Sequence, residues 1–462
     1  MYDDWLKPGR NRRMTYASLF SLAVLVRLAC FTGLIGSDDL AYSYFAQLVS
    51  EFRYEYNLSH FGPRVGVTIP VGVSYRLFGI GESVTVLVPL VTSAASVPLL
   101  VEIGRRLFTA RAGLLAGIFL LTFPIQVRYA TVLVPEPIME FWVLVAVIMY
   151  FDSRANNRWM SPFLAGVTFG VAYLSKEVAL FVGAAFVIDA LLSSQWRLAL
   201  ALTAGLAAVG ASELIFYGAA TGDPLYRAHV IASSQAAYFS DSVAQLKSAW
   251  RLLKAYPYEM LVPNFNLGLH SLVALLIVGA GTRASPRHAV RTLILWAGLP
   301  MAYLNFGSAS LSNYLPVAFA PRYIGIIYAP LFLLAGAILD RWMAKAKSAR
   351  FLCWTALSVI VLSGLATSYA TRAQGYRTAD VASLRAMQQT RHHTNEVIVA
   401  FEGPWAQRWQ FIARLLGGSR SYASTCSDSC LVVQPDALGL PHATRLPTEK
   451  REIGTPLLVF PL

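Results

Sequence analysis

The feature that most constrains this chain is a series of apolar blocks, each about 15–22 residues long. A helix needs about 20 apolar residues to cross the hydrocarbon core of a bilayer. Of the 462 residues, 56% are apolar and only 14% are charged, which is too little polar surface for a soluble protein of this length. The blocks therefore predict an all-α polytopic membrane protein.

About eleven transmembrane helices fit these blocks, at residues 15–35, 84–103, 112–131, 138–151, 161–175, 178–194, 197–217, 266–282, 291–307, 323–340 and 351–371. If the N-terminus is inside, the connection after each even-numbered span faces the cytoplasm and should be cationic. These connections carry Arg105, Arg106, Arg111, Arg154, Arg158, Arg197, Arg283, Arg287, Arg291, Arg341, Lys345, Lys347 and Arg350. An odd number of spans then places the C-terminal tail outside.

The net charge of +13 comes mainly from these short cationic runs. Because that pattern is typical of cytoplasmic loops, it argues against a nucleic-acid partner and for contact with membrane lipids. A phosphate-bearing substrate is also compatible with it. The first apolar block follows a basic N-terminus and has no convincing cleavage site, so we expect a retained signal anchor in a plasma membrane.

Two loops and the tail depart from the repeating pattern of spans. The outer loops at 36–83 and 218–265 are too long for turns, and we expect helices at headgroup level in both, within a transmembrane domain of residues 1–372. Segments 379–390 and 404–416 have a helical pattern, and 396–401, 430–433 and 456–460 have a strand pattern. Residues 373–462 are therefore predicted to form a small extracytoplasmic α/β domain, in which Cys426 and Cys430 would form a disulfide.

Five ionisable residues are predicted to lie on the outer face. Asp38 and Asp39 follow the first span, Glu136 opens the fourth, and Lys176 and Arg322 lie at outer ends of later spans. Singly, the acids could cap helices and the cations could extend to lipid headgroups. Together they favour a site, because charges near membrane depth are costly and usually line a cavity. A carboxylate can accept the proton of an acceptor hydroxyl, while cations or a metal stabilise a departing phosphate.

Five ordered segments between residues 15 and 340 resemble the protein O-mannosyltransferases and the lipid A aminoarabinose transferase, which share the GT-C fold. The segments are Asp38-Asp39 with Tyr42, residues 64–79, residues 128–141 with Glu136, residues 166–180 with Lys176, and Arg322-Tyr323 with Pro330. Two acids depart from the family pattern, since Asp39 stands for the usual Glu and Glu136 for the usual Asp. These changes conserve charge and leave a requirement for a divalent metal open.

The resemblance implies an enzyme of the bacterial inner membrane that uses a polyprenyl-phosphate-linked sugar as donor. It would transfer the sugar, with inversion, to an extracytoplasmic glycan, lipid or protein. Asp38 would be the general base, while Asp39 and Glu136 would orient the acceptor or hold a divalent metal; no other cofactor is expected. The residues expected to bind substrate are Arg64, Tyr42, Lys176, Arg322 and Tyr323.

Two other functional classes compete with this interpretation. A polyprenyl-lipid flippase or transporter predicts inverted repeats and broken helices near the bilayer midplane, whereas this sequence has no internal repeat and gathers its charges at the outer face. A non-catalytic membrane scaffold could recruit partners through its tail. The presence of both outer acids argues against the scaffold.

Overall fold

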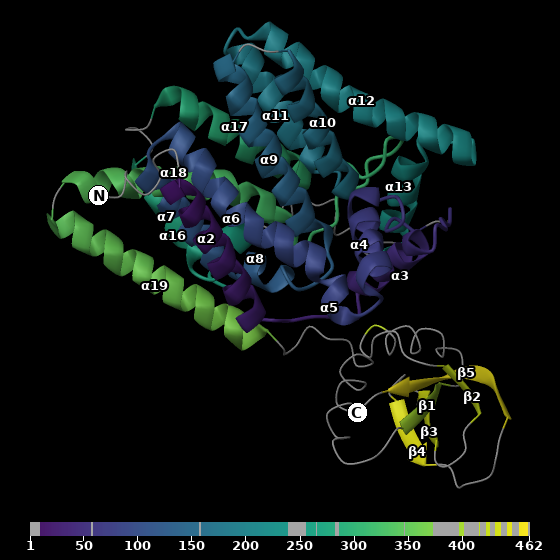
Figure 1. Ribbon diagram of the computed structural model, residues 1–462. Helices are drawn as coiled ribbons and strands as arrows, with labels where there is room; N and C mark the ends of the chain where they lie inside the picture. Colours follow the sequence, from purple (N-terminus) through teal and green to yellow (C-terminus); the bar gives the residue numbers. More distant parts are fainter. Residues whose placement is uncertain are drawn as a thin grey trace. The chain divides into compact units, whose positions relative to one another are not determined.

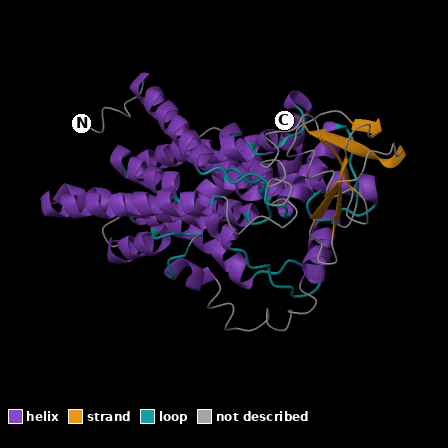
Figure 2. Cartoon of the chain, turned by 90° about the horizontal axis from the view of Figure 1, so that it is seen from below, coloured by secondary structure: helices purple, strands orange, loops and turns teal. Residues whose placement is uncertain are grey.

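The computed structural model describes residues 10–56, 59–156, 159–238, 256–264, 266–281, 286–345 and 347–372, together with Leu415 and the backbone of five strands. The chain divides into two compact units. The first unit comprises Met1–Phe31, Tyr56–Val67 and Pro89–Arg372, and the second comprises Thr32–Glu55, Thr68–Val88 and Ala373–Leu462. The described part of the first unit is built from helices (Figures 1 and 2).

The helices of the first unit follow the apolar blocks of the sequence. They are α2 (Arg10–Ala29), α6 (Leu87–Leu107), α7 (Ala110–Thr122), α8 (Pro124–Tyr129), α9 (Pro135–Asn156), α10 (Met160–Ser175), α11 (Ala179–Leu192), α12 (Trp196–Thr221), α13 (Tyr226–Tyr238), α16 (His270–Gly281), α17 (Arg287–Phe306), the 3-10 helix η2 (Pro321–Ile324), α18 (Gly325–Lys345) and α19 (Lys347–Thr371). Each expected span overlaps one of these helices.

Length and composition alone qualify four of the described helices to cross a membrane: Leu87–Leu107, Trp196–Thr221, Pro321–Lys345 and Lys347–Thr371. The chain therefore has the apolar helices of a membrane protein, as expected. The figure of eleven crossings stays a prediction, because several other apolar helices are shorter than a full span.

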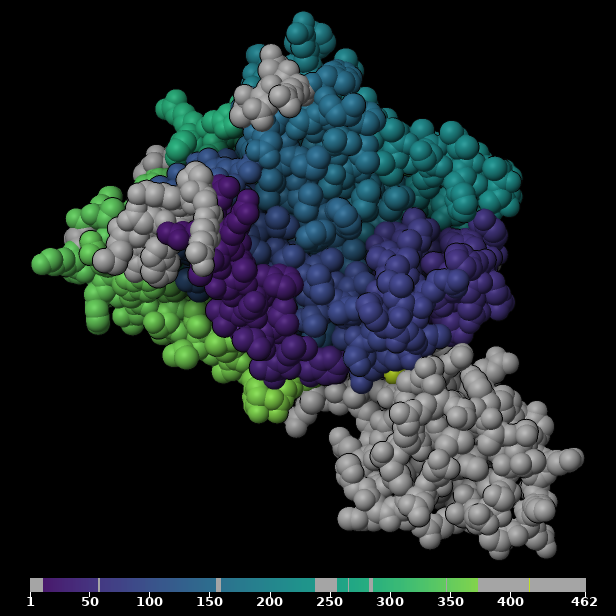
Figure 3. All heavy atoms as spheres, viewed as in Figure 1, coloured from purple at the N-terminus to yellow at the C-terminus, as the bar shows by residue number. Residues whose placement is uncertain are grey.

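Helix α18 forms the centre of the first unit. It packs against α7, α16, α17 and α19, and nearly all its residues are buried. Close approach to α7 depends on Gly336, where a Cβ atom would meet the backbone oxygen of Ala112 at 2.5 Å. Small residues let helices approach closely where lipid supplies no hydrophobic drive for association. On the face shown in Figure 3, side chains fill the spaces between the helices.

Charged contacts mark the two ends of α9. Glu136 lies in its first turn, and Asp152 near its other end pairs with Arg106 at 2.5 Å. At 1.5 Å per residue these two acids are about 24 Å apart along the helix, close to the thickness of a bilayer core. Arg154 pairs with Asp189 at this second end of α9. Arg106 and Arg154, two of the cations predicted to be cytoplasmic, thus lie at the opposite end of α9 from Glu136.

The second unit contains α3 (Asp38–Ser50), most of α4 (Val65–Phe78), α5 (Glu82–Thr85) and a sheet. The helix expected after the acidic pair is α3. The strands, orange in Figure 2, are β1 (Val397–Phe401), β2 (Tyr422–Thr425), β3 (Cys430–Pro435), β4 (Pro441–Arg445) and β5 (Glu452–Phe460). Their order is β2-β5-β1-β3-β4, with β1 and β3 parallel and the other neighbours antiparallel.

The expected strands of the tail coincide with β1, β3 and β5, whereas β2 and β4 were not predicted from the sequence. The expected helices at 379–390 and 404–416 lie outside the described residues, apart from Leu415. Cys426 also lies outside them, and Cys430 is described only as backbone. The α/β domain and its disulfide therefore stay predictions.

Candidate active site

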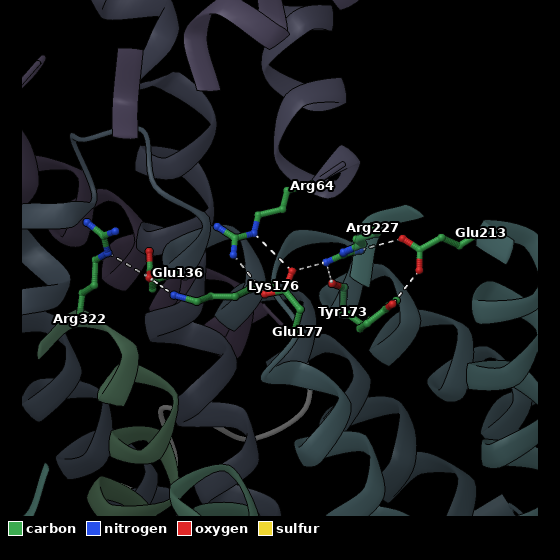
Figure 4. A network of polar contacts seen from close by, with 8 residues as sticks. All are labelled: Arg64, Glu136, Tyr173, Lys176, Glu177, Glu213, Arg227 and Arg322. Carbon is green, nitrogen blue, oxygen red and sulfur yellow. Dashed lines mark hydrogen bonds and ion pairs between the residues drawn. The ribbon is translucent and has the colours of Figure 1, made fainter. Parts of the chain in front are cut away.

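Four residues of the first unit, Glu136, Lys176, Arg322 and Tyr323, form what we call the cationic cluster (Figure 4 shows the first three). Local sequence places each of them. Pro135 begins α9 and puts Glu136 in the first turn, where the helix dipole favours a carboxylate. Lys176 ends α10 in an extended conformation, and Arg322 and Tyr323 belong to η2.

The cationic cluster concentrates two cations on one carboxylate oxygen. Lys176 Nζ donates a hydrogen bond to Glu136 Oε1, and Arg322 Nε lies 3.3 Å from the same oxygen. The Lys176 ammonium also lies 3.2 Å from the ring centre of Tyr323, a cation–π contact. Glu136 and Lys176 are each only 5% exposed. Glu136 Oε2 is buried and has no hydrogen-bond partner among the described residues.

A second group, which we call the Glu177 network, adjoins the cationic cluster in the sequence and in space (Figure 4). Arg64 and Arg227 bind Glu177 at 3.2 and 2.8 Å. Arg227 also pairs with Glu213 at 2.9 Å, and the Tyr173 hydroxyl donates to Glu213 at 2.7 Å. Because Glu177 directly follows Lys176, this network fixes the turn between α10 and α11 from which the Lys176 side chain extends.

The charges of the two groups do not cancel. Arg64, Lys176, Arg227 and Arg322 contribute four cations, against the carboxylates of Glu136, Glu177 and Glu213. Burial lowers the pKa of Lys176 to about 8; Glu136 opposes that shift, and Arg322 and Arg64 add to it. Burial alone would raise the pKa of Glu177, but Arg64 and Arg227 hold it well below its usual range. Among these seven described residues, the cations outnumber the carboxylates by one.

The acidic pair lies in the second unit, and its two members have different surroundings. Asp39 is fully buried and accepts hydrogen bonds from the backbone N–H groups of Ile35, Gly36 and Ser37, at 2.7, 3.2 and 2.6 Å. Burial raises the pKa of Asp39, although these N–H groups oppose the shift. Asp38 is only partly buried. Asp39 therefore holds the loop that presents Asp38 at the start of α3.

The structure brings together five of the eight expected site residues, since Arg64 and the cationic cluster all belong to the first unit. Asp38, Asp39 and Tyr42 belong to the second unit. Tyr42 is fully buried, so its geometry supports a packing role more than a substrate contact. In the part of the chain that the structure describes, no group of three His, Cys, Asp or Glu side chains could hold a metal ion.

The sequence pattern did not indicate four residues of this site, namely Glu177, Arg227, Glu213 and Tyr173. The one available signal was the position of Glu177 directly after Lys176, where a second charge at membrane depth needs a partner. Its partners come from residues 113 and 50 positions away in the sequence, so no local pattern indicates them.

Comparisons with known proteins agree with this architecture. Residues 70–217 match the family model described as dolichyl-phosphate-mannose-protein mannosyltransferase. The apo structure of ArnT from Cupriavidus metallidurans is similar, with a TM-score of 0.59 and 15% identity over 87% of this chain and 85% of ArnT. The chain therefore has the GT-C fold, and its residues 70–217 are similar to the protein mannosyltransferases.

Other solved structures match this GT-C protein at similar levels. ArnT from Cupriavidus metallidurans bound to undecaprenyl phosphate gives a TM-score of 0.55 at 14% identity, over 87% of this chain and 85% of ArnT. The Archaeoglobus fulgidus oligosaccharyltransferase in complex with zinc and sulfate gives 0.57 at 13% identity, over 87% of this chain but 58% of that protein's length. No curated protein matches the sequence. The expected GT-C fold is confirmed, and the match of residues 70–217 agrees with the expected family.

Proposed function

We propose that this GT-C protein transfers a sugar from a polyprenyl-phosphate-linked donor to an acceptor hydroxyl outside the cytoplasm. The observation that carries the proposal is the buried cationic cluster, whose lysine and arginine share one oxygen of Glu136. The chain is also similar in fold to ArnT, which was solved bound to undecaprenyl phosphate, and this similarity supports a polyprenyl-phosphate donor. A buried excess of cations at the end of a helix bundle suits a lipid phosphate that arrives from the membrane.

The donor phosphate would bind to Lys176 and Arg322. Both side chains donate charge-assisted hydrogen bonds, which are about twice as strong as neutral ones. Glu136 would hold the two cations in position in the free protein. Its Oε2 atom, which has no hydrogen-bond partner in the described structure, could then accept a hydrogen bond from a sugar or acceptor hydroxyl.

The chemical step would be a single displacement at the anomeric carbon. Asp38 takes the proton of the acceptor hydroxyl as the acceptor oxygen forms a bond to that carbon. The bond from the anomeric carbon to the phosphate oxygen breaks, and its electron pair leaves with the polyprenyl phosphate. Lys176 and Arg322 stabilise the charge that grows on this phosphate. One displacement inverts the configuration and forms no covalent intermediate with the enzyme.

In this proposal Asp39 acts through Asp38. Its carboxylate accepts hydrogen bonds from three backbone N–H groups, so Asp39 positions the loop. Asp38, and not Asp39, contacts the reacting atoms in this proposal. The enzyme would lie in a bacterial inner membrane, with the Glu136 end of α9 facing out. A glycan, a lipid or a protein could supply the acceptor hydroxyl.

Purified protein in nanodiscs, incubated with a panel of radiolabelled polyprenyl-phosphate sugars and candidate acceptors, tests the proposal. We expect transfer of one sugar, and loss of that transfer in Lys176→Met. Asp223→Asn, which replaces a partly exposed acid in the loop after α12, is the control that should keep activity. Movement of the lipid-linked sugar across liposomes without transfer to any acceptor would instead identify a flippase.

A further inference from the structure

A pocket of about 600 Å³ lies in the first unit where α9 ends and where α10 and α12 begin. Its lining includes two arginines and two tryptophans, namely Arg154, Arg197, Trp159 and Trp196. Its volume is in the range of small-molecule sites. Because Glu136 and Lys176 lie at the other ends of α9 and α10, the pocket is separate from the candidate active site.

The pocket has an excess of positive charge. Arg154 and Arg291 share the single carboxylate of Asp189, at 3.1 and 3.0 Å. Arg197 has no acidic partner within ion-pair distance in the described structure, and its guanidinium lies 5.4 Å from the ring centre of Trp196. The Gln195 side chain makes no capping hydrogen bond at the start of α12, so the pocket also faces the positive end of a helix dipole. An anion is the ligand that these charges favour.

The rim of the pocket is apolar. Trp159 and Trp196 are 54% and 61% exposed, and tryptophan is typical of membrane segments at headgroup level. Along the same helices, Leu164 and Leu200 are exposed as well. The helices α10 and α12 pack tightly, because Gly166 and Gly205 each face the backbone of the other helix. A ligand with an anionic head and apolar chains matches both parts of this surface.

We propose that this pocket binds the headgroup of an anionic glycerophospholipid. Its phosphate contacts Arg154, Arg197 and the start of α12, and its acyl chains lie along the exposed side chains of α10 and α12. Gln195 Oε1, which is buried and has no hydrogen-bond partner among the described residues, accepts a bond from a headgroup hydroxyl. The connections that form the pocket are those predicted to face the cytoplasm, where anionic lipids bind basic pockets between helices.

Native mass spectrometry of the purified full-length protein tests this site. The protein is titrated with phosphatidylglycerol, with phosphatidylcholine of the same acyl chains, and with inorganic phosphate. We expect retention of one phosphatidylglycerol, and about fivefold weaker retention in Arg197→Gln, since one surface cation contributes about that factor. Arg287→Gln, an exposed arginine at the start of α17 outside the pocket lining, is the matched control and should bind like the unchanged protein.

Three outcomes would overturn the proposal. Equal retention of the two phospholipids would show that charge does not select the ligand, and binding of inorganic phosphate alone would point to an ion site. Equal effects of Arg197→Gln and Arg287→Gln would place the lipid elsewhere. Thermal unfolding shows whether the two variants are folded. We expect both to be folded, because Arg197 and Arg287 are exposed and Arg197 has no acidic partner in the described structure.

Discussion

At the scale of single residues, Asp38 and Asp39 are neighbours of the same type with different surroundings, and we expect them to have different functions. Asp39 uses both carboxylate oxygens to bind the backbone of residues 35–37, while Asp38 stays partly exposed. The same substitution at the two positions should therefore have different effects. This contrast separates chemistry from structure more sharply than either change alone.

We expect Asp38→Asn to lower turnover by about 100-fold or more while thermal stability is unchanged, because an amide cannot accept the acceptor's proton. Asp39→Asn should instead lower the unfolding temperature. Its amide nitrogen would face a backbone N–H and leave that buried donor unpaired, at a cost of about 1–3 kcal/mol. Turnover measured beside differential scanning fluorimetry checks both. Full activity in a folded Asp38→Asn protein would remove Asp38 as the base.

If Lys176 binds the donor phosphate as proposed, donor binding should depend on pH. The pKa of Lys176 is lowered to about 8, so its positive charge is present below that pH and is lost as the pH rises through it. We expect kcat/KM for the donor to fall above about pH 8. Lys176→Arg should remove this decline, because a guanidinium stays protonated. A decline that persists unchanged in Lys176→Arg would assign the titration to another group.

At the scale of elements, the turn between α10 and α11 depends on helices that are distant in sequence. Arg64 precedes α4 and Arg227 lies in α13, yet both bind Glu177. The network thus ties α13 and the residue before α4 to the turn that carries Lys176. Its function in this proposal is to position a cation, without contact to the reacting atoms.

We expect Glu177→Gln to raise the KM for the donor more than it lowers kcat, because it displaces Lys176 and leaves the base in place. It should also destabilise the protein by about 3 kcal/mol, since the buried Arg64 loses the Glu177 carboxylate and Arg227 keeps only Glu213. Steady-state kinetics and urea unfolding measure the two effects. Glu51→Gln, at the exposed C-terminal end of α3, should change neither, and a loss of kcat alone in Glu177→Gln would contradict the positioning role.

At the scale of the whole molecule, the first unit carries charged side chains near both ends of the helix α12. The helix α12 runs for 26 residues from Trp196 to Thr221, which corresponds to about 39 Å and exceeds the thickness of a bilayer core. The residues before it line the basic pocket, and the residues after it precede α13 and the Glu177 network. The two ends of α12 should therefore lie on opposite sides of the membrane.

Cysteine labelling in intact cells tests this orientation. In a variant without native cysteines, we expect Asp223→Cys to react with a membrane-impermeant maleimide and Ser194→Cys to react only after permeabilisation. The reverse pattern would place the candidate active site in the cytoplasm and would contradict the proposed reaction. A variant without introduced cysteines sets the background.

The sequence by itself determined the helical membrane class and where the helices of the first unit lie along the chain. These depend on length, apolarity and local charge, which lipid and water act on directly. Only the tertiary structure decided the partners of the buried charges. Glu177 binds Arg64 across 113 positions, and Arg27, in the middle of an apolar block, binds Ser93 across 66. Such partners follow from how helices pack and rotate, which no local pattern encodes.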